Sequence, residues 1–193
     1  MTLNELDLNG TYSYADYLRW TFDEYVELIR GKIFKMAAPN RRHQSISREI
    51  FVPIVNFLKK SDGQVFTAPF DVRLTRKDAI GNEQIFTVVQ PDIVVVCDPS
   101  KLDERGCIGA PDLVVEILSP STSHKDLVDK KSVYEEAGIQ EYWIVHPNDQ
   151  TLIIYSLNAA GEYVPGFLFT KGQTVKSHVL AGFELNLDEV FED

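Results

Sequence analysis

The chain has 193 residues, 44% of them hydrophobic and 25% charged, which is enough for one well-buried core and too little for two domains of usual size. This composition excludes a disordered or low-complexity protein. With 19 Lys and Arg against 29 Asp and Glu, the formal net charge of −10 argues against nucleic-acid binding over the whole surface. We therefore expect one domain over residues 1–193, with a loose leader over 1–12 and an acidic tail over 185–193.

The sequence contains no targeting or membrane signal of the usual kinds. It has no run of about 18 apolar residues, so no membrane span is expected. The first ten residues lack the positive and apolar regions of a secretory signal. Cys97 and Cys107 have no metal-ligand spacing, and two free thiols favour a cytoplasmic location.

The first predicted elements are a short helix, a β-hairpin and a long helix. Ser13 is placed to cap the short helix. Two apolar runs over residues 25–29 and 32–36 flank Arg30-Gly31, which is typical of a hairpin turn. Apolar residues then recur at helical spacing, which predicts a helix over about 43–60.

Strands dominate the rest of the chain. Residues 86–97 and 112–119 are apolar at consecutive positions, so we expect them in the middle of a sheet covered on both faces. Ser123 begins a predicted helix that ends at Ala137. Other strands are predicted over residues 64–74, 142–145, 152–157, 167–169 and 175–180. This order predicts an α/β (α+β) domain with a mixed central β-sheet flanked by helices and an N-terminal β-hairpin.

Glu116 interrupts the predicted buried strand over 112–119. Because an unpaired buried carboxylate is very unfavourable, Glu116 should be neutralised, ion-paired or bound to a metal. Asp112 has the same strand parity, and Asp92 begins another buried run. Carboxylates at the ends of adjacent central strands predict a site for Mg²⁺ or Mn²⁺. For Asp92 or Asp112 alone, strand initiation is the simpler interpretation.

Lys130 falls near the centre of the apolar stripe of the helix that Ser123 begins. Its ammonium either points at the sheet, beside the carboxylates, or forms a surface pair with Asp126 worth a few tenths of a kcal/mol. The helical spacing favours neither interpretation. Taken alone, Glu27 in the hairpin is expected to be a solvated strand residue, and His43 a surface or capping residue.

Together, Pro91-Asp92, Glu116 24 residues later, and Lys130 on the next helix resemble the PD-(D/E)XK nuclease pattern. More closely, the chain resembles the Uma-type (Uma two) restriction endonuclease family over about residues 14–147. The matching segments are Glu27-Leu28-Ile29-Arg30-Gly31, His43, Pro91-Asp92, Pro111-Asp112-Leu113-Val114-Val115-Glu116-Ile117-Leu118-Ser119-Pro120-Ser121-Thr122, Asp126, Lys130, Tyr134, Gly138 and Glu141-Tyr142-Trp143.

Two positions depart from the expected pattern. The superfamily has a Lys two residues after the acid, where this chain has Leu118, and the resemblance implies that Lys130 takes its place. The family's usual Asp-Gly hairpin turn is Arg30-Gly31 here, which keeps the glycine.

The resemblance implies a restriction-endonuclease-like fold and a metal-dependent endonuclease acting on nucleic acid, DNA more than RNA. It implies that Asp92 and Glu116 hold Mg²⁺ or Mn²⁺, with a backbone carbonyl near Ile117. Lys130 then orients the attacking water or stabilises the reacting phosphate, and Glu27 is a further metal or water ligand. Candidate support residues or phosphate contacts are His43, Asp112 and Asp126.

A homodimer is expected, because cutting two strands favours two sites. A rival of another class is a catalytically silent nuclease fold that binds a partner or self-assembles. A third possibility is a buried ion pair between Glu116 and Lys130 that needs no metal.

The charge is unevenly distributed along the chain. Residues 1–24 carry a net charge of −4 and residues 132–193 a net charge of −8, whereas residues 25–131 carry +2. All the candidate site residues lie in this middle stretch. The distribution therefore predicts weak, salt-sensitive binding of nucleic acid, confined to one face.

Overall fold

The structure is a computed structural model, and it describes residues 3–75, 81–119, 125–164 and 166–192. Its helices are α1 (Tyr14–Tyr17), α2 (Arg41–Leu58), α3 (Lys131–Ala137) and α4 (Leu187–Val190), and a π-helical turn over Lys125–Lys130 leads into α3. Its strands are β1 (Val26–Ile29), β2 (Lys32–Lys35), β3 (Gln64–Thr67), β4 (Val72–Leu74), β5 (Thr87–Val89), β6 (Ile93–Val96), β7 (Leu102–Asp103), β8 (Gly106–Ile108), β9 (Leu113–Ile117), β10 (Glu141–His146), β11 (Thr151–Ser156), β12 (Phe167–Thr170), β13 (Thr174–Lys176) and β14 (Glu184–Asn186).

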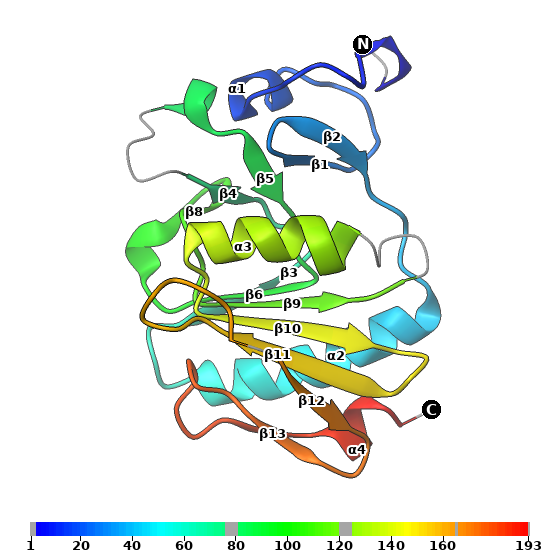
Figure 1. The fold of residues 1–193 in the computed structure, drawn as a ribbon, viewed down its shortest axis with the longest axis vertical. Coiled ribbons are helices and arrows are strands. Elements are labelled where there is room, and N and C mark those ends of the chain that lie inside the picture. Colours follow the sequence, from blue (N-terminus) through cyan, green and yellow to red (C-terminus); the bar gives the residue numbers. More distant parts are fainter. Residues whose placement is uncertain (1–2, 76–80, 120–124, 165, 193) are drawn as a thin grey trace.

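Two mixed six-stranded sheets carry most of these strands (Figure 1). The central sheet has the order β12-β11-β10-β9-β6-β3, with β9 and β10 parallel and the other neighbours antiparallel. The second sheet has the order β2-β1-β5-β4-β8-β7 and includes the predicted hairpin. The mixed central sheet and the N-terminal hairpin are thus as predicted, whereas the sequence did not indicate β7, β8 or a second sheet.

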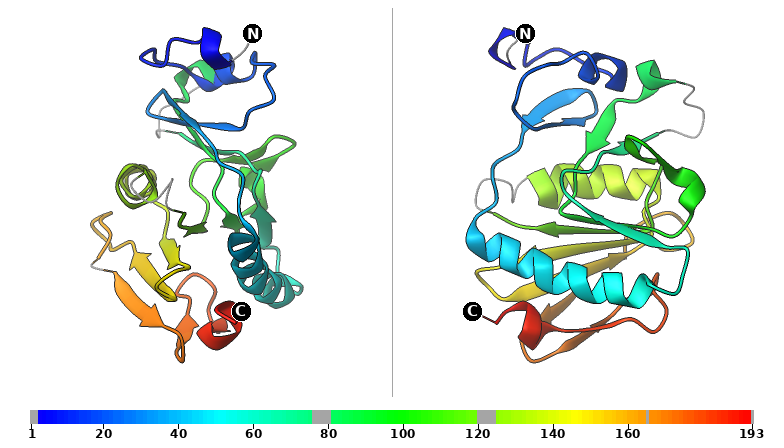
Figure 2. Two further views of the ribbon diagram at one scale, coloured as in Figure 1. Left: turned by 90° about the vertical axis from the view of Figure 1, so that its right-hand side faces the viewer. Right: turned by 180° about the vertical axis from the view of Figure 1, so that it is seen from behind.

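Helices cover both faces of the central sheet, α2 on one face and α3 on the other (Figure 2). Alternate residues of a strand point to opposite faces. Ile93 of β6 accordingly belongs to the core that contains Ile50 of α2. The next residue, Val94, belongs to the core that contains Tyr134 of α3. This double burial explains why β6 and β9 read as continuous apolar runs.

The helix ends follow ordinary capping chemistry. Ser13 accepts a hydrogen bond from the backbone N–H of Asp16 and completes a capping box for α1. Asn40 caps α2 by accepting from the backbone N–H of His43 at 2.9 Å. Gly138 closes α3 with φ of +87°, a left-handed conformation that favours glycine. The predicted cap Ser123 lies outside the described residues.

Two predicted strands are each divided by a proline. The prediction over residues 64–74 separates at Pro69 into β3 and β4, and that over 86–97 separates at Pro91 into β5 and β6. In both cases the two parts belong to different sheets. Proline has no N–H to donate to a sheet, so it marks the crossover. The residue after Pro91, Asp92, therefore lies where the chain passes from one sheet to the other.

Both ends of the chain carry structure beyond what the pattern predicted. The predicted strand over 175–180 ends at Lys176, and β14 and α4 follow. This last segment is not only acidic, because its apolar residues Leu185, Leu187, Val190 and Phe191 are buried. Near the other end, the backbone N–H of Tyr12 donates to the carbonyl of Gly31 at 2.9 Å, which ties this segment to the hairpin.

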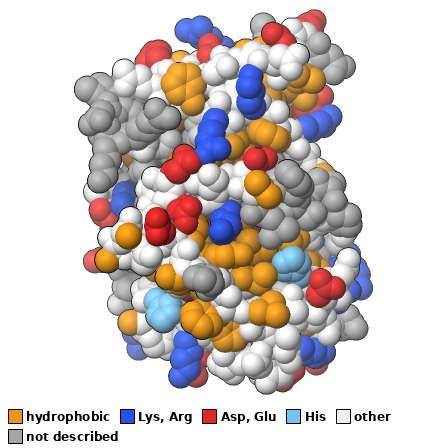
Figure 3. Space-filling model, viewed as in Figure 1, with side chains coloured by type: hydrophobic (Ala, Val, Ile, Leu, Met, Phe, Trp, Pro, Cys, Tyr) orange, Lys and Arg blue, Asp and Glu red, His pale blue; other side chains and the backbone are white. Residues whose placement is uncertain are grey.

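One face of the molecule is shown in Figure 3. There the Lys and Arg side chains are scattered among acidic ones, and hydrophobic side chains gather over the middle of the face.

In the described part of the chain, no helix is both long and apolar enough to cross a membrane.

Candidate active site

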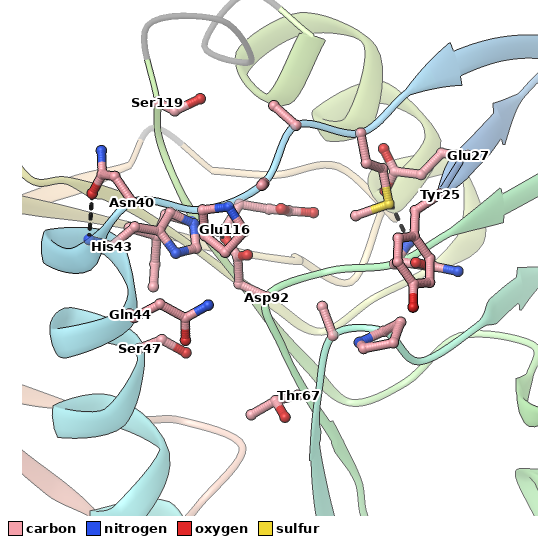
Figure 4. Close-up of a pocket in the computed structure, with 18 of the residues that line it drawn as sticks. Tyr25, Glu27, Asn40, His43, Gln44, Ser47, Thr67, Asp92, Glu116 and Ser119 are labelled. Atoms are coloured by element: carbon pink, nitrogen blue, oxygen red, sulfur yellow. Dashed lines mark hydrogen bonds and ion pairs between the residues drawn. The ribbon is translucent and has the colours of Figure 1, made fainter. Parts of the chain in front are cut away.

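A cleft of about 910 Å³ opens where the start of α2, the hairpin and the ends of two central strands meet (Figure 4). Its lining includes all four residues expected to carry catalysis, Glu27, Asp92, Glu116 and Lys130. His43 lines it as well, from the first turn of α2. Residues more than 100 positions apart in the sequence therefore share one solvent-accessible space.

Asp92 and Glu116 are neighbours because of the strand register. Strands β6 and β9 are antiparallel, with Ile93 opposite Val115, so Asp92 stands beside Glu116 at the same end of the sheet. Asp92 Oδ2 accepts a hydrogen bond from the backbone N–H of Ile117 at 2.7 Å. The same oxygen lies 3.2 Å from Nε2 of His43. Two flanking elements therefore fix the orientation of the Asp92 carboxylate.

Lys130 lies between two buried carboxylates. Its Nζ is 2.7 Å from Oε1 of Glu116 and 2.8 Å from Oε1 of Glu27. Lys130 is 2% exposed, Glu116 4% and Glu27 0%. The ammonium is therefore aimed at the sheet, and Glu27 is not the solvated strand residue expected from the hairpin alone. Only the backbone of Asp126 is described, so its side chain lies outside the described part of the structure.

Tyr134 is a site residue that the sequence did not single out for a role in the site. Its hydroxyl donates to Oε1 of Glu116 at 2.6 Å. Burial, and then the negative charge of Glu116, raise the pKa of Tyr134 well above its usual value, which keeps the hydroxyl a donor. Lys130 and Tyr134 are four residues apart, so both lie on one face of the helix. The four-residue spacing from Lys130 is therefore the feature of the sequence that could have identified Tyr134 as a site residue.

Replacing Tyr134 with Phe should lower the free energy of unfolding by about 1–2 kcal/mol, because a hydrogen bond to a buried charged group is lost. Urea denaturation measures the change. Tyr163→Phe is the matched control, because the Tyr163 hydroxyl is buried without a hydrogen-bond partner among the described residues. We expect this control to be neutral or stabilising. Equal losses in the two variants would show that the bond to Glu116 is unimportant.

Gln90 joins the site to the second sheet. Its backbone N–H donates to Oε1 of Glu27 at 2.8 Å. Its side-chain Nε2 donates to Oδ1 of Asp71 at 2.8 Å and to the hydroxyl of Tyr17 at 3.2 Å. Burial raises the pKa of the Asp71 carboxyl. The sequence did not single out Gln90 either, although it is a polar residue that directly follows a buried strand.

Asp112 does not join the site, which corrects its expected support role. Asp112 directly precedes β9 and lies four residues before Glu116, roughly 13 Å away along the strand direction. Its Oδ2 accepts from the backbone N–H of Cys97 at 2.7 Å, and its Oδ1 lies 3.9 Å from Nζ of Lys101. Equal strand parity gave it the right face of the sheet but the wrong end.

The donor atoms of the site suit a hard cation held by few protein ligands. Among the described residues, no three or more His, Cys, Asp or Glu side chains are grouped as a metal site. Asp92 and Glu116 still offer two adjacent carboxylates that open on the cleft. Magnesium is commonly held by one or two carboxylates, with waters and substrate phosphates completing its shell. Two such donors therefore fit Mg²⁺ or Mn²⁺.

Comparison with known proteins places the chain in a family. The model of a family described as "Uma2: Putative restriction endonuclease" matches residues 14–188. The chain belongs to the Uma2 family. The resemblance drawn from the motifs is therefore confirmed, and the family supports a nuclease function in general terms.

Two further proteins resemble this Uma2 member. An uncharacterized protein of Synechocystis sp. (strain ATCC 27184 / PCC 6803 / Kazusa) is 28% identical over 152 residues, which cover 77% of this chain and 76% of that protein. A crystal structure from Anabaena variabilis ATCC 29413, described as a "putative nuclease belonging to DUF820", superposes with a TM-score of 0.73 at 22% identity. The match covers 93% of this chain and 97% of the other, and it confirms the expected nuclease-like fold.

Proposed function

We propose that this Uma2 protein is a metal-dependent endonuclease that hydrolyses phosphodiester bonds of nucleic acid, DNA more readily than RNA. One observation carries the proposal. Asp92 and Glu116 stand side by side in the cleft, and the Lys130 ammonium lies 2.7 Å from Glu116. Two carboxylates and an ammonium facing one open space form a site suited to a phosphate diester and a hard cation.

Each side chain then has a distinct task. Asp92 and Glu116 hold Mg²⁺ or Mn²⁺, and His43 and the Ile117 N–H orient the Asp92 carboxylate. A bound cation lowers the pKa of a water molecule and offsets the charge that develops on the scissile phosphate. Lys130 presents positive charge to the reacting groups, and Glu27 supplies a second carboxylate that holds its ammonium in place.

Nicking of supercoiled plasmid DNA in the presence of Mn²⁺ tests the proposal. Wild type should nick the plasmid, and Asp92→Ala and Glu116→Gln should abolish nicking because each removes a cation ligand. Asp149→Asn is the control, since that side chain is 75% exposed and does not line the cleft. Equal nicking by wild type and both site variants would rule out this site as the nuclease centre.

A catalytically silent fold that binds a partner is the second candidate, favoured by one observation. Lys130 already has two carboxylate partners, so one of the two buried negative charges is balanced without a metal. Calorimetric titration with Mn²⁺ separates the two functions. Binding that Glu116→Gln removes supports the nuclease, and absence of binding supports the silent fold.

The expected homodimer stays a prediction. Strand β12 lies at the edge of the central sheet with Phe167 63% exposed and Leu168 59% exposed, a surface on which two copies can pair. Light scattering coupled to size-exclusion chromatography gives the mass in solution, and a monomer mass at high protein concentration would contradict the prediction.

A further inference from the structure

An exposed aromatic side chain lies on one wall of the cleft. Tyr25 lines the cleft and is 61% exposed. Figure 4 shows Tyr25 and His43 on opposite sides, with Asp92 and Glu116 between them. An exposed aromatic ring beside a proposed phosphate site offers a flat surface to a nucleobase.

The hairpin fixes the position of this ring relative to the catalytic groups. Tyr25 precedes β1 and stands two residues before Glu27, so both side chains leave the strand on the same side, roughly 7 Å apart. The backbone carbonyl of Tyr25 accepts from the N–H of Met36 at 2.9 Å, which extends the hairpin pairing to this residue. The backbone of Tyr25 is therefore fixed near that of Glu27, on the wall of the cleft that the hairpin forms.

Each of the three Lys and Arg side chains that line the cleft lies near a carboxylate. Lys35 lies 3.8 Å from Glu24, and Arg48 lies 2.7 Å from Glu49. Lys130, the third lining cation, is held between two buried carboxylates. Against these three bases, five acids line the cleft, namely Asp23, Glu24, Glu27, Asp92 and Glu116, a difference of −2. A duplex has a dense row of phosphates on both strands, and binding it requires many available Lys and Arg side chains.

The remaining lining suits bases more than phosphates. Met36, Pro39, Phe51 and Pro69 contribute apolar surface to the same cleft. Stacking and apolar contact bind unpaired bases irrespective of sequence, because every base has a π-face. In a duplex these faces are covered by neighbouring base pairs.

We propose that the cleft takes a nucleic-acid strand that is unpaired at the point of cutting, with the base next to the scissile phosphate stacked on Tyr25. This inference rests on the proposed function, because Asp92 and Glu116 place the phosphate. DNA and RNA share the stacking chemistry, so the test includes both.

Binding of fluorescently labelled oligonucleotides measures the preference directly. Wild type, with Ca²⁺ as the divalent cation, is titrated into a single-stranded DNA, the same sequence as RNA, and the DNA duplex. We expect tighter binding of a single strand than of the duplex, and a loss of about five- to a hundred-fold in Tyr25→Ala. Tyr25→Phe should retain most of the affinity, and Phe167→Ala, an equally exposed aromatic elsewhere, should leave it unchanged.

Tighter binding of the duplex, or no effect of Tyr25→Ala, would overturn the inference, as would failure to bind any oligonucleotide. Cleavage is scored separately, with Mn²⁺, on circular single-stranded DNA and on plasmid. Cleavage that depends on Asp92 but not on Tyr25 refutes only the inference. Strand binding that depends on Tyr25, without cleavage of either DNA, refutes only the nuclease.

Discussion

Replacing Lys130 with Met is expected to lower the free energy of unfolding by about 3–5 kcal/mol. The ammonium is 2% exposed and has carboxylates of Glu27 and Glu116 at 2.8 and 2.7 Å. Without it, two negative charges stay buried close together, and neither retains its cationic partner. Methionine fills most of the space, so the loss reports charge rather than a cavity.

Neutralising the two carboxylates that lose their cationic partner should restore stability. Glu116→Gln added to Lys130→Met still leaves Glu27 charged and 0% exposed, so recovery should be partial. Adding Glu27→Gln as well should recover most of the loss, because neutral buried groups replace the ion cluster. Urea denaturation measures all three variants.

Lys131→Met is the matched control. Lys131 is the next residue, and its ammonium lies over the ring of Tyr155 at 4.8 Å from the centroid. Losing this contact should cost about 0.5–1 kcal/mol. A Lys130→Met loss no larger than this would mean that the buried carboxylates do not depend on Lys130.

Local pattern singled out Glu116 and Lys130, although it did not decide whether Lys130 points at the sheet. Burying an acid inside a β-branched run, or a lysine inside an apolar helical stripe, is unfavourable unless each has a partner of opposite charge. Glu116 and Lys130 are such partners, 2.7 Å apart. The pattern also gave the helix ends at Asn40 and Gly138 within a few residues, because capping chemistry is local.

Long-range pairing is what the sequence did not provide. Glu27 is buried because β1 pairs with β5, and the chain then turns at Pro91 to bring Asp92 to the same cleft. No pattern within the hairpin reports that pairing. Asp112 shows the opposite failure, since strand parity predicts a face of the sheet but says nothing about which end of the strand faces the site.

Manganese should raise the melting temperature of the wild type. At a free concentration one hundred times the dissociation constant, binding to the folded state alone adds about 2.7 kcal/mol. For a domain of this size that corresponds to roughly 5–10 °C. Asp92→Ala should lose this shift, and Asp149→Asn should keep it because its side chain is 75% exposed and does not line the cleft.

Glu116→Gln should separate metal binding from folding, because its two expected effects differ. Without metal, its stability should stay within about 1 kcal/mol of wild type, since Lys130 keeps Glu27 as a partner and the buried cluster becomes neutral. With manganese, its melting temperature should not rise, because a cation ligand is missing. An equal rise in wild type and Glu116→Gln would place the bound cation elsewhere. If manganese raises the melting temperature of neither protein, the cluster of Glu27, Glu116 and Lys130 binds no cation, as expected of the silent fold.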